Sequence, residues 1–77
     1  MKTLAQRWKA IDLWCYRRGV RQQFAFFKGC DPSIEKYYTR IRMVATSGKD
    51  PVEEDTPWIE SMELTIAMLR DRSKVAA

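Results

Sequence analysis

Lysine and arginine are the residues of this sequence whose number and placement could support a specific chemistry. The 77 residues include 14 Lys and Arg and 10 Asp and Glu, for a net charge of +4 at pH 7. Residues 1–47 carry ten basic and three acidic side chains, whereas residues 48–77 carry four and seven. A dense positive surface attracts polyanions because binding releases their counterions. The sequence therefore predicts a polyanion-binding N-terminal part and an acidic part that faces away from the ligand.

Residue types that commonly catalyse reactions or bind metals are scarce. Histidine is absent, and the only two cysteines, Cys15 and Cys30, stand far apart, so we expect no zinc site and no histidine base. No glycine-rich phosphate loop, Ser/His/Asp set or pair of catalytic carboxylates stands out. The acidic run at residues 53–55 follows Pro51, where we expect a solvated loop. These observations predict a protein that is not an enzyme and that holds no cofactor and no metal.

The composition predicts one folded domain over residues 1–77. Hydrophobic residues make up 45% and aromatic residues 12%, which is too apolar for a disordered tail. No apolar run approaches the roughly 18 residues of a membrane span, and no signal-peptide pattern is present. We therefore expect a cytoplasmic protein without membrane association, in which both cysteines are reduced.

Local start and stop signals divide the N-terminal half into helices that would carry the basic residues. Thr3 can cap a first helix whose apolar residues recur at helical spacing and which ends near Gly19. A second helix fits residues 20–28, although one continuous helix over residues 3–28 is an alternative. The third helix begins at Pro32, where a missing N–H costs nothing, and extends to about residue 45.

The C-terminal half holds one more helix. A loop of about ten residues is expected at 46–55, because breakers and charged residues dominate there. Thr56 is the expected cap of the last helix, with Pro57 in the first position. The pattern as a whole predicts an all-α fold, a compact bundle of four helices. In the third helix, the residues expected on the inner face are Ile34, Tyr37, Tyr38, Ile41 and Val44, and those expected in an outer row are Ser33, Lys36, Arg40 and Met43.

The run from Gln22 to Tyr38 resembles the helix-turn-helix of small regulators of bacterial, phage and plasmid type. In that family a small residue stands four positions before the turn glycine, as Ala25 does before Gly29, and a buried aliphatic residue follows at the place of Ile34. Lys28 departs from the pattern, which has an apolar residue before the glycine.

A second likeness is to the N-terminal part of the FlhC flagellar activator family. It rests on Gly19-Val20-Arg21, on Ile34 to Tyr37 and on the segment from Pro51 to Trp58. This likeness implies DNA binding and nothing further.

The helix-turn-helix resemblance implies roles for named residues. The helix at 32–45 would be the recognition helix, which places outward residues at base edges in the major groove. Ser33, Lys36 and Arg40 would then read bases. The residues expected to contact phosphates are Arg17, Arg18, Arg21, Lys28 and Arg42, with Thr39 as a hydroxyl donor. The predicted function is a transcriptional regulator that binds double-stranded DNA as a homodimer.

The aromatic residues leave a second function open. Several of them fall off the apolar stripes, and Trp14, Tyr16 and Phe26 are the ones predicted to form a dimer or partner interface. The alternative is therefore a protein-binding inhibitor or adaptor, of phage- or plasmid-encoded type, that docks through exposed aromatics and the basic face.

Overall fold

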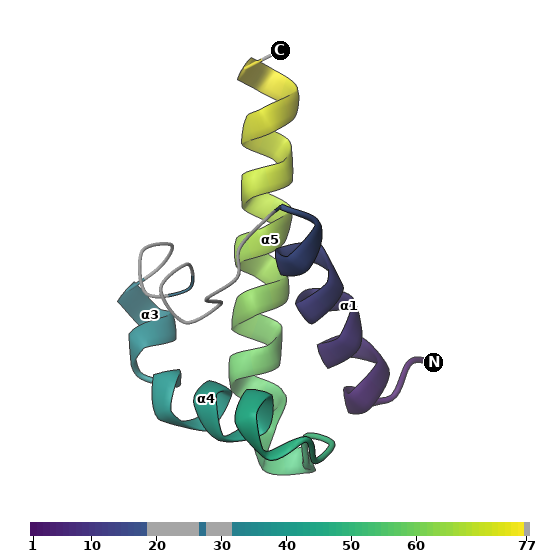
Figure 1. Cartoon of the computed structure of the whole chain (residues 1–77). Coiled ribbons are helices and arrows are strands. Elements are labelled where there is room, and N and C mark those ends of the chain that lie inside the picture. Colours follow the sequence, from purple (N-terminus) through teal and green to yellow (C-terminus); the bar gives the residue numbers. More distant parts are fainter. Residues whose placement is uncertain (19–26, 28–31, 77) are drawn as a thin grey trace.

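The computed structural model describes residues 1–18, 27 and 32–76, and for residues 73–76 the backbone alone. These residues form α1 (Leu4–Arg17), α3 (Pro32–Glu35), α4 (Tyr38–Ser47), a 3-10 turn η1 (Glu53–Asp55) and α5 (Thr56–Ala76) (Figure 1). The predicted all-α fold of four helices is confirmed. None of the residues described belongs to a strand.

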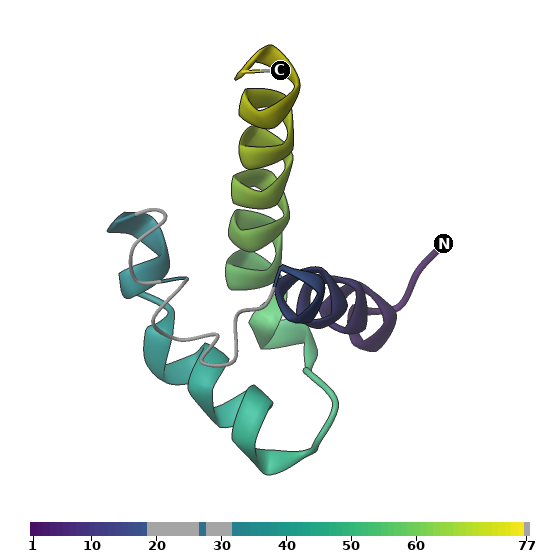
Figure 2. The ribbon, with the colours of Figure 1, turned by 45° about the horizontal axis from the view of Figure 1, so that its top comes forward.

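Helix α5 is the axis on which the other elements pack. With 21 residues it is about 30 Å long. Helix α1 lies on one side of it, and α3 and α4 lie on the other (Figures 1 and 2). The C-terminal turns of α5 extend beyond the other helices in both views. A single helix therefore carries both a packed half and a projecting half.

Helix α1 begins as predicted from its cap. The Thr3 hydroxyl accepts a hydrogen bond from the Gln6 amide at 3.1 Å, and the Gln6 side chain accepts one from the Thr3 amide at 2.9 Å. These two bonds form a capping box, which satisfies amides that the first turn leaves without partners. The helix ends at Arg17, so the alternative of one continuous helix over residues 3–28 is wrong. The second helix predicted at residues 20–28 lies outside the described residues, apart from the buried Phe27.

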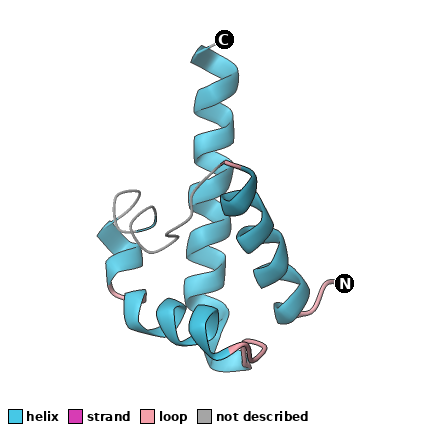
Figure 3. Ribbon diagram, viewed as in Figure 1, coloured by secondary structure: helices cyan, strands magenta, loops and turns pink. Residues whose placement is uncertain are grey.

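The core contains most of the apolar residues that helical spacing identified in the described part of the chain, although Tyr37 and Tyr38 are only partly buried. Figure 3 shows the helices of the described residues. Trp8 and Trp58 meet edge to face at its centre, with ring centroids 5.2 Å apart and planes at 79°. Such a pair adds attraction between ring edge and face to the burial of both rings. The buried hydrophobic residues are Trp8, Ile11, Cys15, Phe27, Ile34, Ile41, Val44, Trp58, Ile59, Met62 and Ile66. Tyr37 is partly buried against this cluster, as is Trp14.

The predicted recognition helix over residues 32–45 is not continuous, and that prediction is wrong. Helix α3 ends after one turn at Glu35, and residues 36–37 form a turn before α4 begins. Tyr37 has left the helical conformation (φ −101°, ψ 2°), and its amide donates to the Ile34 carbonyl at 2.9 Å. The physical reason is packing: α3 is held against α5, while α4 continues to the loop that precedes α5.

The segment between α4 and α5 is shorter than predicted. Helix α4 extends to Ser47 and ends at Gly48, which adopts the left-handed conformation (φ 69°) that glycine accepts most easily. Residues 53–55 are already a 3-10 turn that runs directly into α5. Thr56 does not act as the cap, because it is the first residue of α5 and its hydroxyl donates to the Glu53 carbonyl at 2.7 Å.

No helix formed by the described residues is long and apolar enough to cross a membrane.

Candidate nucleic-acid interface

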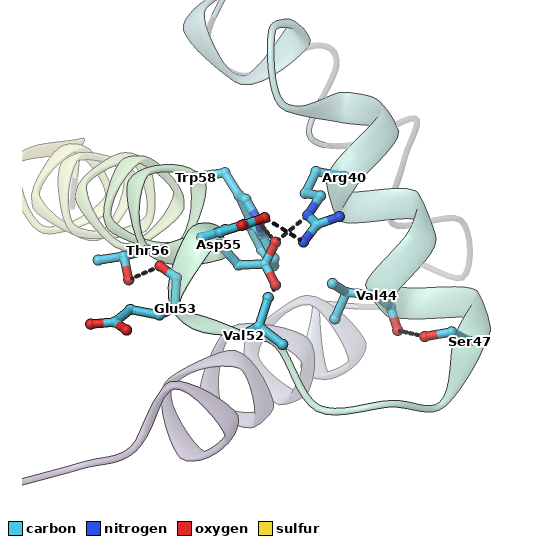
Figure 4. A network of polar contacts seen from close by, with 9 residues as sticks. Arg40, Val44, Ser47, Val52, Glu53, Asp55, Thr56 and Trp58 are labelled. Carbon is cyan, nitrogen blue, oxygen red and sulfur yellow. Dashed lines mark hydrogen bonds and ion pairs between the residues drawn. The ribbon is translucent and has the colours of Figure 1, made fainter.

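A buried aspartate organises the corner where α4 meets the start of α5. The side chain of Asp55 is almost wholly buried, with 1% of the residue exposed. Its carboxylate accepts hydrogen bonds from Trp58 Nε1 at 2.9 Å, from the Val52 amide at 2.7 Å and from Arg40 Nε at 2.6 Å (Figure 4). The prediction that residues 53–55 form a solvated loop is therefore wrong for Asp55. The cause is that three donors replace the water that the carboxylate loses.

The same contacts keep Asp55 ionised. Burial by itself raises the pKa of Asp55, but the hydrogen bonds from Trp58, Val52 and Arg40 and the positive charge of Arg40 lower it further than burial raises it. The net pKa lies below the ordinary value of an aspartate. Asp55 therefore provides a fixed negative charge to which Arg40 is bound.

Arg40 is directed towards Asp55 with its side chain 39% exposed, and its predicted role as a base reader stays a prediction. Its guanidinium binds Asp55 and lies 3.6 Å from a carboxylate oxygen of Glu54. Because Nε donates to Asp55, Arg40 stabilises the corner between α4 and α5.

The other two predicted base readers do not share a continuous helix face. Ser33 is exposed on α3, and its hydroxyl lies 3.2 Å from that of Ser61 on α5. Lys36 is exposed in the turn after α3, and its ammonium nitrogen lies 5.5 Å from the centroid of the Tyr37 ring. The expected row of Ser33, Lys36, Arg40 and Met43 is therefore interrupted after Lys36.

The structure describes four of the residues predicted to contact phosphates, and all four are exposed: Arg17, Arg18, Thr39 and Arg42. Arg17 and Arg18 stand at the C-terminal end of α1, and the guanidinium of Arg18 lies over the Trp14 ring at 4.7 Å from its centroid. Thr39 and Arg42 are exposed on α4 and three residues apart, which places them on one side of that helix. Arg21 and Lys28 lie outside the described residues.

Ion pairs distinguish two groups of cations within residues 1–47. Arg7 binds Glu63 on α5, and Arg40 binds Asp55 and Glu54, so both take their partners from the acidic part of the chain. With the residues that the structure describes, the remaining cations form no ion pair: Lys2, Lys9, Arg17, Arg18, Lys36 and Arg42. Lys2 and Lys9 were absent from the predicted site, although the position of Lys9 off the apolar stripe of α1 could have indicated its exposure.

The predicted interface aromatics occupy different environments. Tyr16 is 76% exposed, as expected of a residue off the apolar stripe. Trp14 is partly buried and lines a groove of about 240 Å³ between α1 and α5. The groove is lined by Arg7, Ala10, Ile11, Trp14, Glu63, Ile66, Ala67 and Arg70. Phe26 lies outside the described residues.

The exposed cations of α1, of the turn after α3 and of α4 are therefore the candidate contact residues, and they belong to elements on both sides of α5. Among the described residues, no three His, Cys, Asp or Glu side chains gather in a way that could hold a metal ion. Comparison of the chain with models of known protein families, with curated proteins and with solved structures found no match.

Proposed function

We propose that this protein is a small DNA-binding regulator that holds double-stranded DNA through phosphate contacts. The observation that carries the proposal is the set of exposed cations that no described acid neutralises: Lys2, Lys9, Arg17, Arg18, Lys36 and Arg42. Cations without acidic partners are free to neutralise phosphates, and each phosphate contact releases counterions from the duplex.

The distribution of acids supports the same proposal. Glu63 and Asp55 are bound to arginines, and the exposed acids after residue 48 belong to the loop, η1 and α5: Asp50, Glu53, Glu54, Glu60 and Asp71. In the described part of residues 1–47 the exposed acid is Glu35 on α3, next to Lys36. The exposed cations of α1 and α4 are on other elements. A duplex that approaches the outer side of α1 or of α4 would thus meet mainly positive charge, which favours one orientation of the protein on the DNA.

The ion pair of Arg40 with Asp55 sets the kind of binding that we propose. Phosphate contacts fix the position of a protein on the duplex but carry no direct sequence information. Among the predicted base readers, Lys36 is the long cationic side chain that forms no ion pair with the residues that the structure describes. We therefore propose strong, salt-sensitive binding with limited base discrimination from α3 and α4.

The test is the affinity for a random-sequence duplex as salt increases from about 50 to about 200 mM. Six or more phosphate contacts predict a loss of about a thousandfold over this range. The triple variant Arg17→Ala, Lys36→Ala, Arg42→Ala should lower the slope of log affinity against log salt by about 2.7, at about 0.9 for each lost contact.

The matched control is Lys49→Ala, which removes one exposed cation from the acidic part of the chain and should leave the slope unchanged. Absence of duplex binding at low salt would refute the DNA proposal.

A protein-binding adaptor or inhibitor is the second candidate, favoured by the groove between α1 and α5. The groove combines apolar side chains, such as Trp14 and Ile66, with charged groups at Arg7, Glu63 and Arg70. Pockets that bind partner side chains have this combination of apolar lining and a few polar groups. Binding to a partner protein that is lost in Tyr16→Ala and retained in Arg42→Ala would favour this candidate over DNA binding.

A further inference from the structure

A row of four exposed residues runs along α5 on the side away from the core. Glu60, Leu64, Met68 and Arg72 are spaced four residues apart, so they form one ridge on the helix surface. Leu64 is 64% exposed and Met68 is 49% exposed. Helix α5 contacts α1 as far as the groove that Ala67 and Arg70 line, so the row lies mainly along the packed part of α5 and ends near its projecting C-terminal turns (Figures 1 and 2). The row thus presents two adjacent apolar side chains on an accessible helix.

Glu60 at one end of this row and Arg72 at the other make it complementary to the same row of a second copy that runs in the opposite direction. We propose that α5 pairs in an antiparallel manner with α5 of a second copy of this chain through Glu60, Leu64, Met68 and Arg72. A two-fold axis that crosses α5 at the level of Ile66 would place Glu60 against Arg72 of the second copy and Leu64 against Met68 of the second copy. The same interface then contains each of these contacts twice, as two-fold symmetry requires.

The order of the charged residues favours the antiparallel pair over a parallel pair. A parallel pair in register would place Glu60 against Glu60 and Arg72 against Arg72, and like charges in contact are repulsive. In the antiparallel pair the apolar residues supply the attraction, and the end charges fix direction and register. Ridges of this spacing pack at a crossing angle of about −50°, so the two helices would cross along a contact of about 18 Å.

A short contact of this kind predicts a weak dimer. Two ridges of four residues bury less than the 1,200 Å² or so that stable complexes usually need, unless neighbouring residues join them. The inference concerns association of the protein with itself and does not depend on DNA. It also differs from the interface expected from the sequence, which placed Trp14, Tyr16 and Phe26 at the contact.

The test is sedimentation equilibrium of the full chain without DNA, over concentrations from about 1 to about 500 µM, where a weak dimer should form. Glu60→Arg places two arginines together and should weaken the dimer at least tenfold, as should Arg72→Glu. The double variant Glu60→Arg, Arg72→Glu reverses both charges and should restore the dimer. These positions are exposed, so the helical content of each variant, measured by circular dichroism, should match that of the original chain.

Two methionines of similar exposure provide the matched control. Met68→Asp should weaken the dimer, whereas Met43→Asp on α4, where the residue is 53% exposed, should not. A chain that is monomeric at every concentration would overturn the inference. A dimer that survives Met68→Asp, that Tyr16→Ala dissociates, or that the double charge reversal fails to restore would overturn it too. The DNA proposal rests on other residues and a separate assay, so failure of either one leaves the other standing.

Discussion

Arg40 and Arg42 stand two residues apart on α4 and belong to two different regions of the molecule. Arg40 enters the corner between α4 and α5, where Asp55 binds its guanidinium. Arg42 belongs to the outer surface of α4 and forms no ion pair with any residue that the structure describes. Identical side chains therefore have a structural role in one region and remain available for a ligand in the other.

The difference follows from what each region buries. In the corner, a buried carboxylate requires donors, and in the described part of the chain no buried side-chain nitrogen or oxygen lacks a hydrogen bond. On the outer surface water solvates each cation, so no internal partner is needed. A high local density of arginine thus indicates a binding surface only after the arginines held by buried acids are set aside.

The largest loss of stability should come from replacing Asp55, the buried aspartate of the corner. Asp55→Ala removes three hydrogen bonds and leaves Arg40 and the Trp58 indole without their partner. We expect the free energy of unfolding to fall by about 3 kcal/mol, because the buried Trp58 N–H loses its acceptor and Arg40 loses its main countercharge. For a domain of this size that corresponds to a melting temperature lower by roughly 12 to 24 °C.

Thermal unfolding followed by circular dichroism measures this change. The control is Glu54→Ala, which removes a neighbouring but exposed carboxylate and should change the free energy by less than about 0.5 kcal/mol. Equal melting temperatures for the two variants would mean that Asp55 does not organise the corner.

The two arginines should separate stability from binding. Arg40→Ala should lower the free energy of unfolding by about 2 kcal/mol, because Asp55 keeps its bonds to Trp58 and Val52 but loses its countercharge. Arg42→Ala should change it by less than about 0.5 kcal/mol, yet lower the salt slope of duplex binding by about 0.9. Urea titration and a fluorescence binding assay measure the two quantities. A larger loss of salt slope in Arg40→Ala than in Arg42→Ala would contradict the structural role assigned to Arg40.

Strong acid should weaken the corner, because it protonates Asp55. The pKa of Asp55 is lower in the folded protein than in the unfolded chain, so the folded state favours its ionised form. This contribution to stability is fully present above the unfolded value of about 3.9 and is lost as the pH falls through the folded pKa. We expect Asp55→Asn to remove this part of the pH dependence of the free energy of unfolding. A variant as acid-sensitive as the original chain would show that other carboxylates cause the loss.

A smaller loss of stability than at Asp55 or Arg40 is expected at Gly48, which connects the outer part of α4 to the corner. Its φ of 69° is left-handed, and a Cβ there would meet no atom within 4 Å, so the cost of Gly48→Ala is conformational alone. We expect a loss of about 1 kcal/mol. Gly48→Asn should cost less, since asparagine tolerates this conformation better, and comparison of the two by urea titration provides the control. Equal free energies of unfolding for the two variants would mean that residue 48 leaves the left-handed region when it is replaced.

Several features of the fold could be predicted from the sequence because they depend on near neighbours. Trp8, Ile11 and Cys15 repeat at helical spacing, so the buried side of α1 is visible in the sequence, and Thr3 with Gln6 specifies its first turn. The division into a basic and an acidic part is likewise a property of composition along the chain.

The site itself was decided by contacts between distant residues. Arg40 and Asp55 are 15 residues apart, and Arg7 and Glu63 are 56 apart, so no local pattern marks them as partners. The break at residues 36–37 has the same origin, because the sequence from Pro32 to Ser47 is compatible with one helix until α3 is packed against α5. Local spacing of apolar residues determined which segments are helical and which face of each helix is buried. Only the tertiary structure decided which charges are buried with partners and which stay exposed. The reason is that burial of a charge requires hydrogen-bond donors or countercharges from several elements at once.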